Sequence, residues 1–205
     1  MNAHRFRSML RRRNLAALII SSLFSLVAVC GFVVSGAQSE EKEEREVVDK
    51  IPKHLPIKVK IKKPEKLKDL KNEDWLGEVE LEVTNTGAKP IYYLHISVYM
   101  PDVFAPSGHN YGSGFEYGRG ALVAFSEPVR SDDVPIQPGE VVVLKVNADE
   151  AEGWKRGRAK GEMTKPKRLE FIFNYINFGD GTGFVGSDGG PFPQRKERGA
   201  NAPCA

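Results

Sequence analysis

The sequence has few of the residues from which metal centres and disulfide frameworks are built. Its 205 residues include two cysteines and four histidines. No H-E-x-x-H, C-x-x-C or paired-histidine spacing occurs, so a zinc site is not expected. The G-x-S-x-G motif that presents a nucleophilic serine is also missing. These absences argue against metal-dependent and nucleophilic catalysis, and no cofactor is expected.

The excess of positive charge belongs to the N-terminal segment alone. The whole chain carries 30 Lys and Arg against 27 Asp and Glu, a net charge of +3. Residues 1–37 contain five arginines and no acid, so residues 38–205 hold 25 bases and 27 acids, a net charge of −2. Because the remainder of the chain is nearly neutral, nucleic acid is not expected as a partner.

Residues 1–37 have the pattern of a secretory signal peptide or a signal anchor. A basic stretch over residues 5–13 precedes an uncharged, apolar stretch over residues 15–34, and small residues follow up to Ala37. Cleavage after Ala37 is one possibility. Retention is the other, because an apolar stretch of this length also spans a bilayer. Either way the arginines predict that the later residues are exported, to the periplasm, the outer surface or the medium.

The two cysteines allow two modifications. Cys30 lies in the apolar stretch as in a lipoprotein signal, where it would be acylated, but Val29 stands where such signals have a small residue. A plain apolar role is the alternative for Cys30. If the leader is cleaved, Cys204 is the one remaining cysteine, so it either pairs with another molecule or remains a free thiol near the C-terminus.

Apolar residues at alternate positions predict a β-rich domain. Within residues 57–61 apolar residues alternate with lysines, and within residues 79–83 apolar residues alternate with glutamates, as in strands with one buried face. About seven short strands without a long helix indicate an all-β fold of two antiparallel sheets, a β-sandwich. A segment at 149–155 has the pattern of one or two helical turns. The other predicted strands are 91–100, 122–125, 141–146, 169–178 and 184–185.

The composition divides the chain into four parts. After the signal peptide or anchor (1–37) comes an acidic linker (38–54), in which residues 40–49 hold six acids and residues 52–56 hold two prolines. The β-sandwich covers residues 55–187. A glycine-rich, flexible C-terminal tail covers residues 188–205.

Two segments resemble a known family. Residues 77–91, GEVELEVTNTGAKPI, and residues 136–144, IQPGEVVVL, are similar to strand-and-turn segments of bacterial immunoglobulin-like domains of the CARDB and fibronectin type III kind. The resemblance spans roughly residues 55–187 and implies an immunoglobulin-like sandwich. It also implies an adhesive, binding or spacer module without catalysis. The chain departs from the family in a long insertion at 101–120 and in its tail.

The predicted 101–120 loop is the most distinctive candidate for a ligand-binding surface. Aromatic side chains on a loop above a rigid sandwich can stack on sugar rings, which predicts carbohydrate binding. The alternative is that these side chains fold back onto the sandwich and the glycines only permit turns. The candidate binding residues are His109, Tyr111, Phe115, Tyr117 and Arg119.

Acidic residues offer two further candidates. Asp102, Asp132 and Asp133 are predicted in loops, and a pair of carboxylates can hydrolyse a glycosidic bond, although nothing in the sequence determines their separation. Asp180 and Asp188 lie in a glycine-rich run with oxygen ligands that suit calcium, but the EF-hand spacing is not met. A β-hairpin with ordinary turn residues is the alternative for that run.

Two clusters of bases, at 53–71 and 155–168, either attract an anionic partner or lie on solvated faces. Taken together, the sequence predicts a non-enzymatic binding or structural module, envelope-associated or secreted. It would act through contacts with another envelope or extracellular protein, and with the membrane if residues 15–34 are retained. Carbohydrate binding through the 101–120 loop and a hydrolase built on loop carboxylates are the alternatives.

Overall fold

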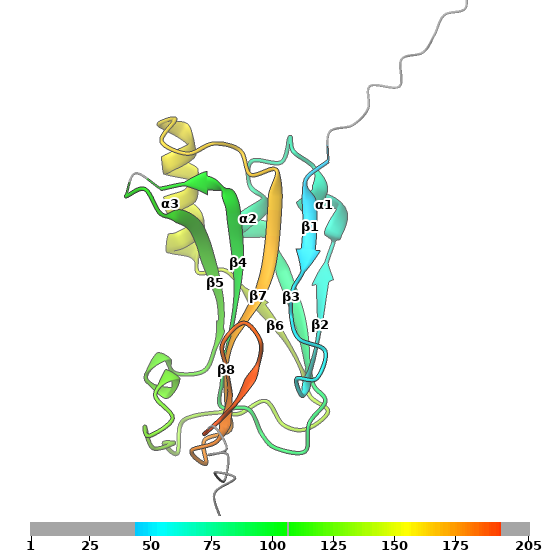
Figure 1. Cartoon of the computed structure of the whole chain (residues 1–205), viewed down its shortest axis with the longest axis vertical. Coiled ribbons are helices and arrows are strands. Elements are labelled where there is room, and N and C mark those ends of the chain that lie inside the picture. The colour runs from blue at the N-terminus through cyan, green and yellow to red at the C-terminus, as the bar shows by residue number, and fades with distance from the viewer. Residues whose placement is uncertain (1–43, 106, 194–205) are drawn as a thin grey trace, which may run out of the picture. The chain divides into compact units, whose positions relative to one another are not determined.

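The computed structural model describes residues 44–105 and 107–193 of the chain. In this part, two mainly antiparallel sheets pack against each other, and three α-helices lie at one end of them (Figure 1). The predicted all-β sandwich is therefore confirmed as a fold class. No helix among these residues is long and apolar enough to cross a membrane. The predicted leader, Cys30 and Cys204 lie outside the described residues.

The smaller sheet consists of three strands in the order β2–β3–β6: β2 (Ile57–Lys62), β3 (Glu80–Asn85) and β6 (Val141–Lys145). Val59 of β2 lies opposite Val83 of β3, which in turn lies opposite Val142 of β6. Apolar residues at alternate positions thus share the inner face, as the sequence pattern predicts. All three strands confirm the prediction, within a residue or two at their ends.

The larger sheet has the order β5–β4–β7–β8–β9, and β1 pairs with β7 in parallel. The long strands β4 and β7 lie at its centre and bring Ile96, Val98, Leu169, Phe171 and Phe173 into the core, each at most 1% exposed. Its members are β1 (Glu46–Asp49), β4 (Tyr93–Phe104), β5 (Asn110–Tyr117), β7 (Arg168–Asn177), β8 (Gly183–Val185) and β9 (Gly190–Phe192).

The predicted 101–120 loop is instead mostly a β-hairpin. β4 continues through Pro101 to Phe104, with a register irregularity between Met100 and Phe104, and β5 returns beside it. Glycines at alternate positions of β5 conceal its strand pattern in the sequence. At Gly114 a Cβ atom would lie 2.9 Å from the Nε2 atom of His95, so a larger residue there would require the histidine side chain to shift.

The predicted strand at 122–125 is wrong. Its residues begin in a 3₁₀ turn, η1 (Gly120–Val123), where Leu122 donates to the Arg119 carbonyl at 2.8 Å and Ala124 to the Ala121 carbonyl at 3.1 Å. Leu122 is 0% exposed, and the Asn177 side chain donates to its carbonyl at 2.7 Å. Local hydrogen bonds thus satisfy an apolar run that is too short to need a strand partner.

Both segments that flank the predicted domain contribute strands. β1 lies in the predicted acidic linker and pairs with β7 from Glu46 opposite Arg168 to Asp49 opposite Phe171. Just before it, Arg45 is only 2% exposed, so residues 45–49 belong to the fold and not to a solvated spacer. β9 lies in the predicted tail and pairs with β8. The remaining tail, 194–205, lies outside the described residues.

Three α-helices complete the described part: α1 (Pro64–Lys68), α2 (Trp75–Glu78) and α3 (Ala148–Ala159). α3 is longer than the one or two turns predicted for 149–155. The side chain of Asn147 caps it by accepting from the Asp149 amide at 2.8 Å. Trp154 of α3 and Trp75 of α2 meet edge to face, with ring centroids 6.0 Å apart.

Candidate binding edge

One side of the sandwich is open. β1 pairs only with β7 in its sheet, and β2 pairs only with β3 in the other, so each strand has one free edge in the described part of the chain. Figure 1 shows β1 and β2 beside each other on the same side of the two sheets. We call this side, formed by β1 and β2, the open edge.

The backbone of β2 presents three residues at the open edge. The Thr86 amide donates to the Pro56 carbonyl at 3.0 Å, so residues 56 and 86 face each other through their hydrogen-bonding groups. Such groups alternate along an antiparallel ladder. The N–H and C=O groups of Lys58, Lys60 and Lys62 therefore point to β3. Those of the alternate residues point away from the sheet: Ile57, Val59 and Ile61.

The shorter strand β1 presents fewer groups. The Glu46 amide donates to the Lys167 carbonyl at 2.8 Å and the Lys50 amide to the Phe171 carbonyl at 2.9 Å. By the same alternation, the N–H and C=O groups of Val47 and Asp49 point away from β7. β2 is therefore the longer of the two free edges.

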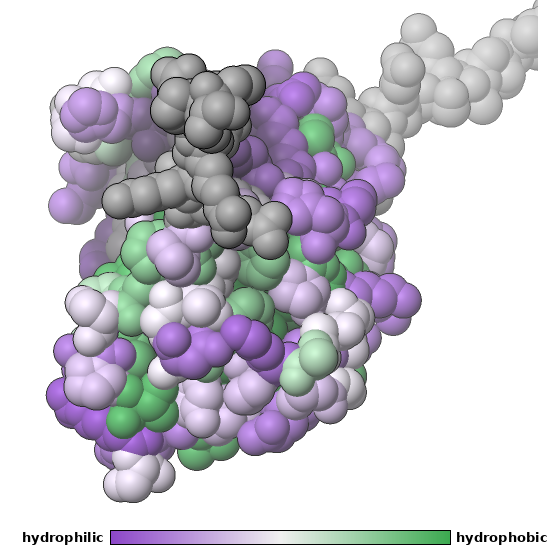
Figure 2. All heavy atoms as spheres, turned by 60° about the horizontal axis from the view of Figure 1, so that its bottom comes forward, coloured by the Kyte–Doolittle hydropathy of each residue, from purple (hydrophilic) through white to green (hydrophobic). Residues whose placement is uncertain are grey.

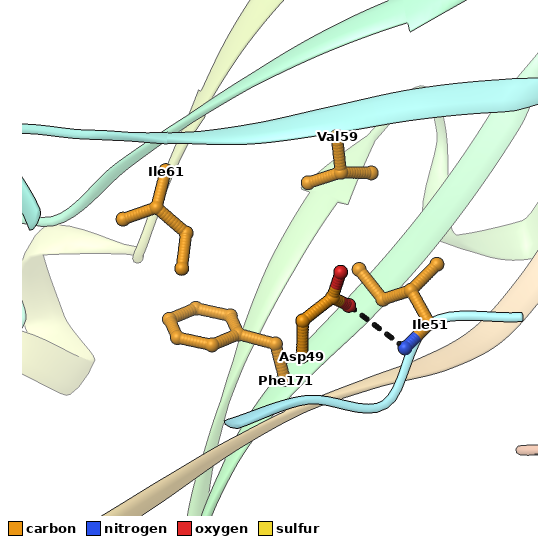
Figure 3. A pocket seen from close by; sticks show the side chains of 5 residues that line it. All are labelled: Asp49, Ile51, Val59, Ile61 and Phe171. Carbon is orange, nitrogen blue, oxygen red and sulfur yellow. Dashed lines mark hydrogen bonds between the residues drawn. The ribbon is translucent and has the colours of Figure 1, made fainter. Parts of the chain in front are cut away.

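A pocket of about 160 Å³ lies inside the open edge, between the sheets. Figure 3 shows Val59 and Ile61 reaching from β2 towards Phe171, with Asp49 and Ile51 on the same side as Phe171. Although they lie on the inner face, the β2 side chains Val59 and Ile61 are only partly buried, whereas Leu81 and Val83 of neighbouring β3 are 0% exposed. The core side chains of β3 are thus fully buried, whereas those of β2 are partly accessible to solvent.

One carboxylate lies in this mainly apolar pocket. Asp49 accepts from the Ile51 amide at 2.9 Å through Oδ1 and from Lys53 Nζ at 2.5 Å through Oδ2 (Figure 3 draws the first). The acid therefore holds the turn after β1 and is partly neutralised by Lys53. A hollow of about 330 Å³ continues the pocket along the same turn and the start of β2, lined by Asp49, Ile51, Pro52, Lys53, Ile57, Lys58 and Val59.

The outer face of β2 is a row of lysines. Lys58 lies opposite Thr84, Lys60 opposite Glu82, and Lys62 opposite Glu80. Lys62 and Lys145 both bind Glu80, at 3.2 and 2.8 Å, and these bonds hold the pKa of the Glu80 carboxyl below its usual value. No ion pair engages Lys58 or Lys60 within the described residues.

The opposite side of the sandwich is closed. β5 and β6 approach each other in a single bridge between Phe115 and Val146. α3, which follows β6, is fastened to β5: the Ser113 hydroxyl donates to the Glu150 carboxylate, and the Gly114 amide donates to it at 3.3 Å. Further along, the Trp154 ring packs 5.2 Å from the ring of Tyr111, centroid to centroid. We call this side, formed by β5, β6 and α3, the closed side.

The five residues predicted to bind a ligand are not gathered on one surface. Phe115 is 0% exposed and packs on Phe171, and Tyr111 is half-buried against Trp154. Burial raises the pKa of Tyr111. Tyr117 donates its hydroxyl to the Val134 carbonyl at 3.0 Å. His109 is exposed at the hairpin turn, at the other end of β5 from Arg119.

Arg119 has a local structural task instead. Its guanidinium binds Glu127 at 2.6 Å and Asp133 at 3.0 Å, and it donates to the Pro128 carbonyl at 3.0 Å. This network holds the long loop between η1 and β6. The hydrogen bond from Arg119 keeps the pKa of Asp133 below its usual range. Figure 2 views this end of the molecule and shows hydrophobic residues scattered among polar ones.

Asp102 is separated from the other two candidate carboxylates. It lies within β4, near the Phe104 end of the strand, and accepts from the Lys167 amide at 2.6 Å, whereas Asp133 is bound to Arg119 beyond the other end of β4. The strand between Leu94 and Asp102 spans more than about 20 Å, whereas glycosidase carboxylates lie within about 10 Å of each other. Asp132 is exposed in the same loop as Asp133.

The calcium candidates do not form a cluster. Asp180 binds Lys89 at 2.7 Å, and its carboxylate also accepts from the Thr182 amide and hydroxyl. The Lys89 bond lowers the pKa of Asp180. Asp188 lies in the turn between β8 and β9. Within the described residues, no group of three or more His, Cys, Asp or Glu is arranged to hold a metal ion.

The second basic cluster is largely paired with acids in the described part of the chain, whereas the first is not. In the second cluster, Lys155 binds Asp74 at 3.0 Å, while Arg158 and Lys165 both bind Glu73, at 3.3 and 2.5 Å. The bond from Lys165 lowers the pKa of Glu73. In the first, three of the eight lysines are paired within the described residues: Lys53, Lys62 and Lys66. Lys58 and Lys60 are among the other five, and they are the two that lie at the open edge.

The sequence did not predict the open edge, because the sequence of a single strand does not show which strands lie beside it in the sheet. The alternation of lysine and apolar residues in β2 indicates only that its outer face is exposed to solvent. No family model, curated protein or solved structure matches the chain.

Proposed function

We propose that the chain is a non-enzymatic binding module of the cell envelope or the extracellular space, which holds an extended segment of another protein at its open edge. The observation that carries this proposal is the free edge of β2 beside a pocket between the sheets. An added strand would bond to the N–H and C=O groups of Ile57, Val59 and Ile61. Strand addition of this kind obtains affinity from the backbone and specificity from pockets for alternate side chains.

The arrangement of the acids supports a binding role over a hydrolytic one. Asp102 lies near the Phe104 end of β4, and Asp133 lies in a loop beyond the other end; the Lys167 amide donates to Asp102 and Arg119 donates to Asp133. Two carboxylates so placed cannot flank one scissile bond. The buried aromatics of β5 also leave the carbohydrate alternative without a shared stacking surface.

Selection from a displayed library of short random peptides tests the proposal. The full-length chain should enrich peptides that bind it saturably. The variant Val59→Pro should not bind them, because its ring replaces the outward N–H of β2 and obstructs an incoming strand. Val143→Pro is the matched control, since Val143 is 45% exposed on β6 in the same sheet. Failure to enrich any peptide, or equal binding by Val59→Pro, would refute the proposal.

A further inference from the structure

From the side chains around the open edge we infer that the segment bound there alternates acidic and apolar residues. The inference rests on the proposed function and adds the chemical class of the partner. The acidic residues would lie beside the lysine row Lys58, Lys60 and Lys62. The apolar residues between them would enter the pocket between the sheets.

The two faces of β2 impose these two requirements. A strand added to β2 places its side chains about 5 Å from those of β2, on the same faces. On the outer face it meets lysines, of which Lys58 and Lys60 have no ion pair in the described part of the chain. On the inner face it meets Val59 and Ile61 at a pocket of about 160 Å³. A cavity of about 150 Å³ accommodates a benzene-sized group, so one aliphatic side chain fits.

β3 already satisfies the same requirements on the other edge of β2. Its Glu82 lies opposite Lys60, its Glu80 binds Lys62 at 3.2 Å, and Val83 lies opposite Val59 on the inner face. The sequence of β3, ELEVTN, thus alternates acids with apolar residues at the positions that face β2. An incoming segment of this pattern would place a carboxylate on each side of Lys60.

A second copy of the chain does not meet the requirement. If β2 paired with β2 of another copy, lysines of both strands would share the outer face of the joined sheet. Like charges opposite each other destabilise a strand pair. Lysines on an edge strand are a known obstacle to association between like strands. The lysine row of β2 would repel basic segments and attract acidic ones, so it would select between partners by their charge.

A pair of synthetic peptides tests the inference on the full-length chain. One carries the sequence of residues 77–87, GEVELEVTNTG, and the other has lysine in place of its three glutamates. Isothermal titration calorimetry should give saturable binding of the acidic peptide, about tenfold or more tighter than of the lysine peptide, and weaker at high salt. Lys60→Glu should reduce or reverse the preference. Lys160→Glu directly after α3, the matched charge reversal, should not.

Hydrogen exchange locates the bound peptide. In the free chain the amides of Lys58 and Lys60 should exchange slowly and those of Val59 and Ile61 fast; the acidic peptide should slow the fast ones. Equal binding of both peptides, no effect of Lys60→Glu, or protection elsewhere would overturn the inference. So would a dimer in sedimentation that Val59→Pro dissolves. If library peptides without acids still bind in a Val59-dependent way, the proposed function stands and the inference fails; if no peptide binds, both fail.

Discussion

In the part of the chain that the structure describes, the two sheets are joined along the closed side and are not joined along the open edge. On the closed side, the sheets are joined by the bridge between Phe115 and Val146 and by α3, whose Glu150 and Trp154 attach it to β5. At the open edge, β1 and β2 belong to different sheets and leave backbone groups without a partner among residues 44–105 and 107–193. The comparison shows that the sandwich does not need both sides closed to exclude water from its centre. One side is thereby available for an interaction.

The largest difference should appear in stability. Trp154→Ala removes a side chain that is 1% exposed and contacts Trp75 and Tyr111, so it should lower the free energy of unfolding by about 3–5 kcal/mol. Val59→Ala at the open edge should cost about 1 kcal/mol or less, because Val59 is already partly accessible. Urea unfolding followed by circular dichroism measures both.

A size-matched control makes the first comparison sharper. Val146 on the closed side is 8% exposed, so Val146→Ala should cost more than Val59→Ala although the same atoms are removed. Equal losses for the two valines would mean that the open edge is packed as tightly as the closed side.

Neighbouring proline substitutions should separate the two faces of the β2 backbone. Lys60→Pro removes an N–H that points to β3 and leaves a β3 carbonyl without its donor, which should cost about 2 kcal/mol or more. Val59→Pro removes an N–H that points to solvent and should cost less in unfolding, mainly the lost packing of its side chain. Similar losses would contradict the assignment of the free edge, which rests on the bond between Thr86 and Pro56.

Alternation in β2, β3 and β7, and a run of β-branched residues in β6, made these strands predictable from the sequence. In β2 every second residue is apolar, and in β3 Leu81 and Val83 alternate with glutamates, so the residues of the inner face follow directly. β1 was not predictable, because its four residues, EVVD, do not alternate. Its position depends on distant contacts. Arg45 donates to the carbonyls of Leu67, at 2.5 Å, and Pro166, at 2.9 Å, and lies 4.8 Å over the Trp75 ring.

Burial explains why such an arginine is difficult to anticipate. Removal from water lowers the pKa of Arg45 to about 10, so burying this charge is costly, and the nearby acids Glu73, Asp69 and Asp102 partly offset the cost. No pattern within residues 40–49 identifies carbonyl partners that lie 22 and 121 positions away. The predicted acidic linker was therefore reasonable from composition and wrong for residues 45–49.

The two sides should also respond differently to acid, the smallest effect of the three. β1 is held to β7 partly by charge. Lys50 donates to the Glu170 carboxylate at 2.6 Å, and Arg168 donates to the same carboxylate at 2.8 Å. These bonds lower the pKa of Glu170 from its usual value of 4.5. A carboxyl whose pKa is lower in the folded state stabilises the fold above its usual pKa. That contribution is lost as the pH falls through the folded value. Below about pH 4.5, β1 should therefore loosen from β7.

Hydrogen exchange of the Val48 and Lys50 amides between pH 5 and pH 3, corrected for intrinsic rates, measures this loosening. In Glu170→Gln the protection of these amides should already be reduced at pH 5 and should change less with pH. Asp133→Asn is the control: the hydrogen bond from Arg119, which follows β5, lowers the pKa of Asp133. This variant should reduce the acid dependence of global unfolding and leave the β1 amides as in the wild type. If Asp133→Asn loosened β1 as much as Glu170→Gln, the two regions would respond to acid as one unit, and the open edge would not be separately held.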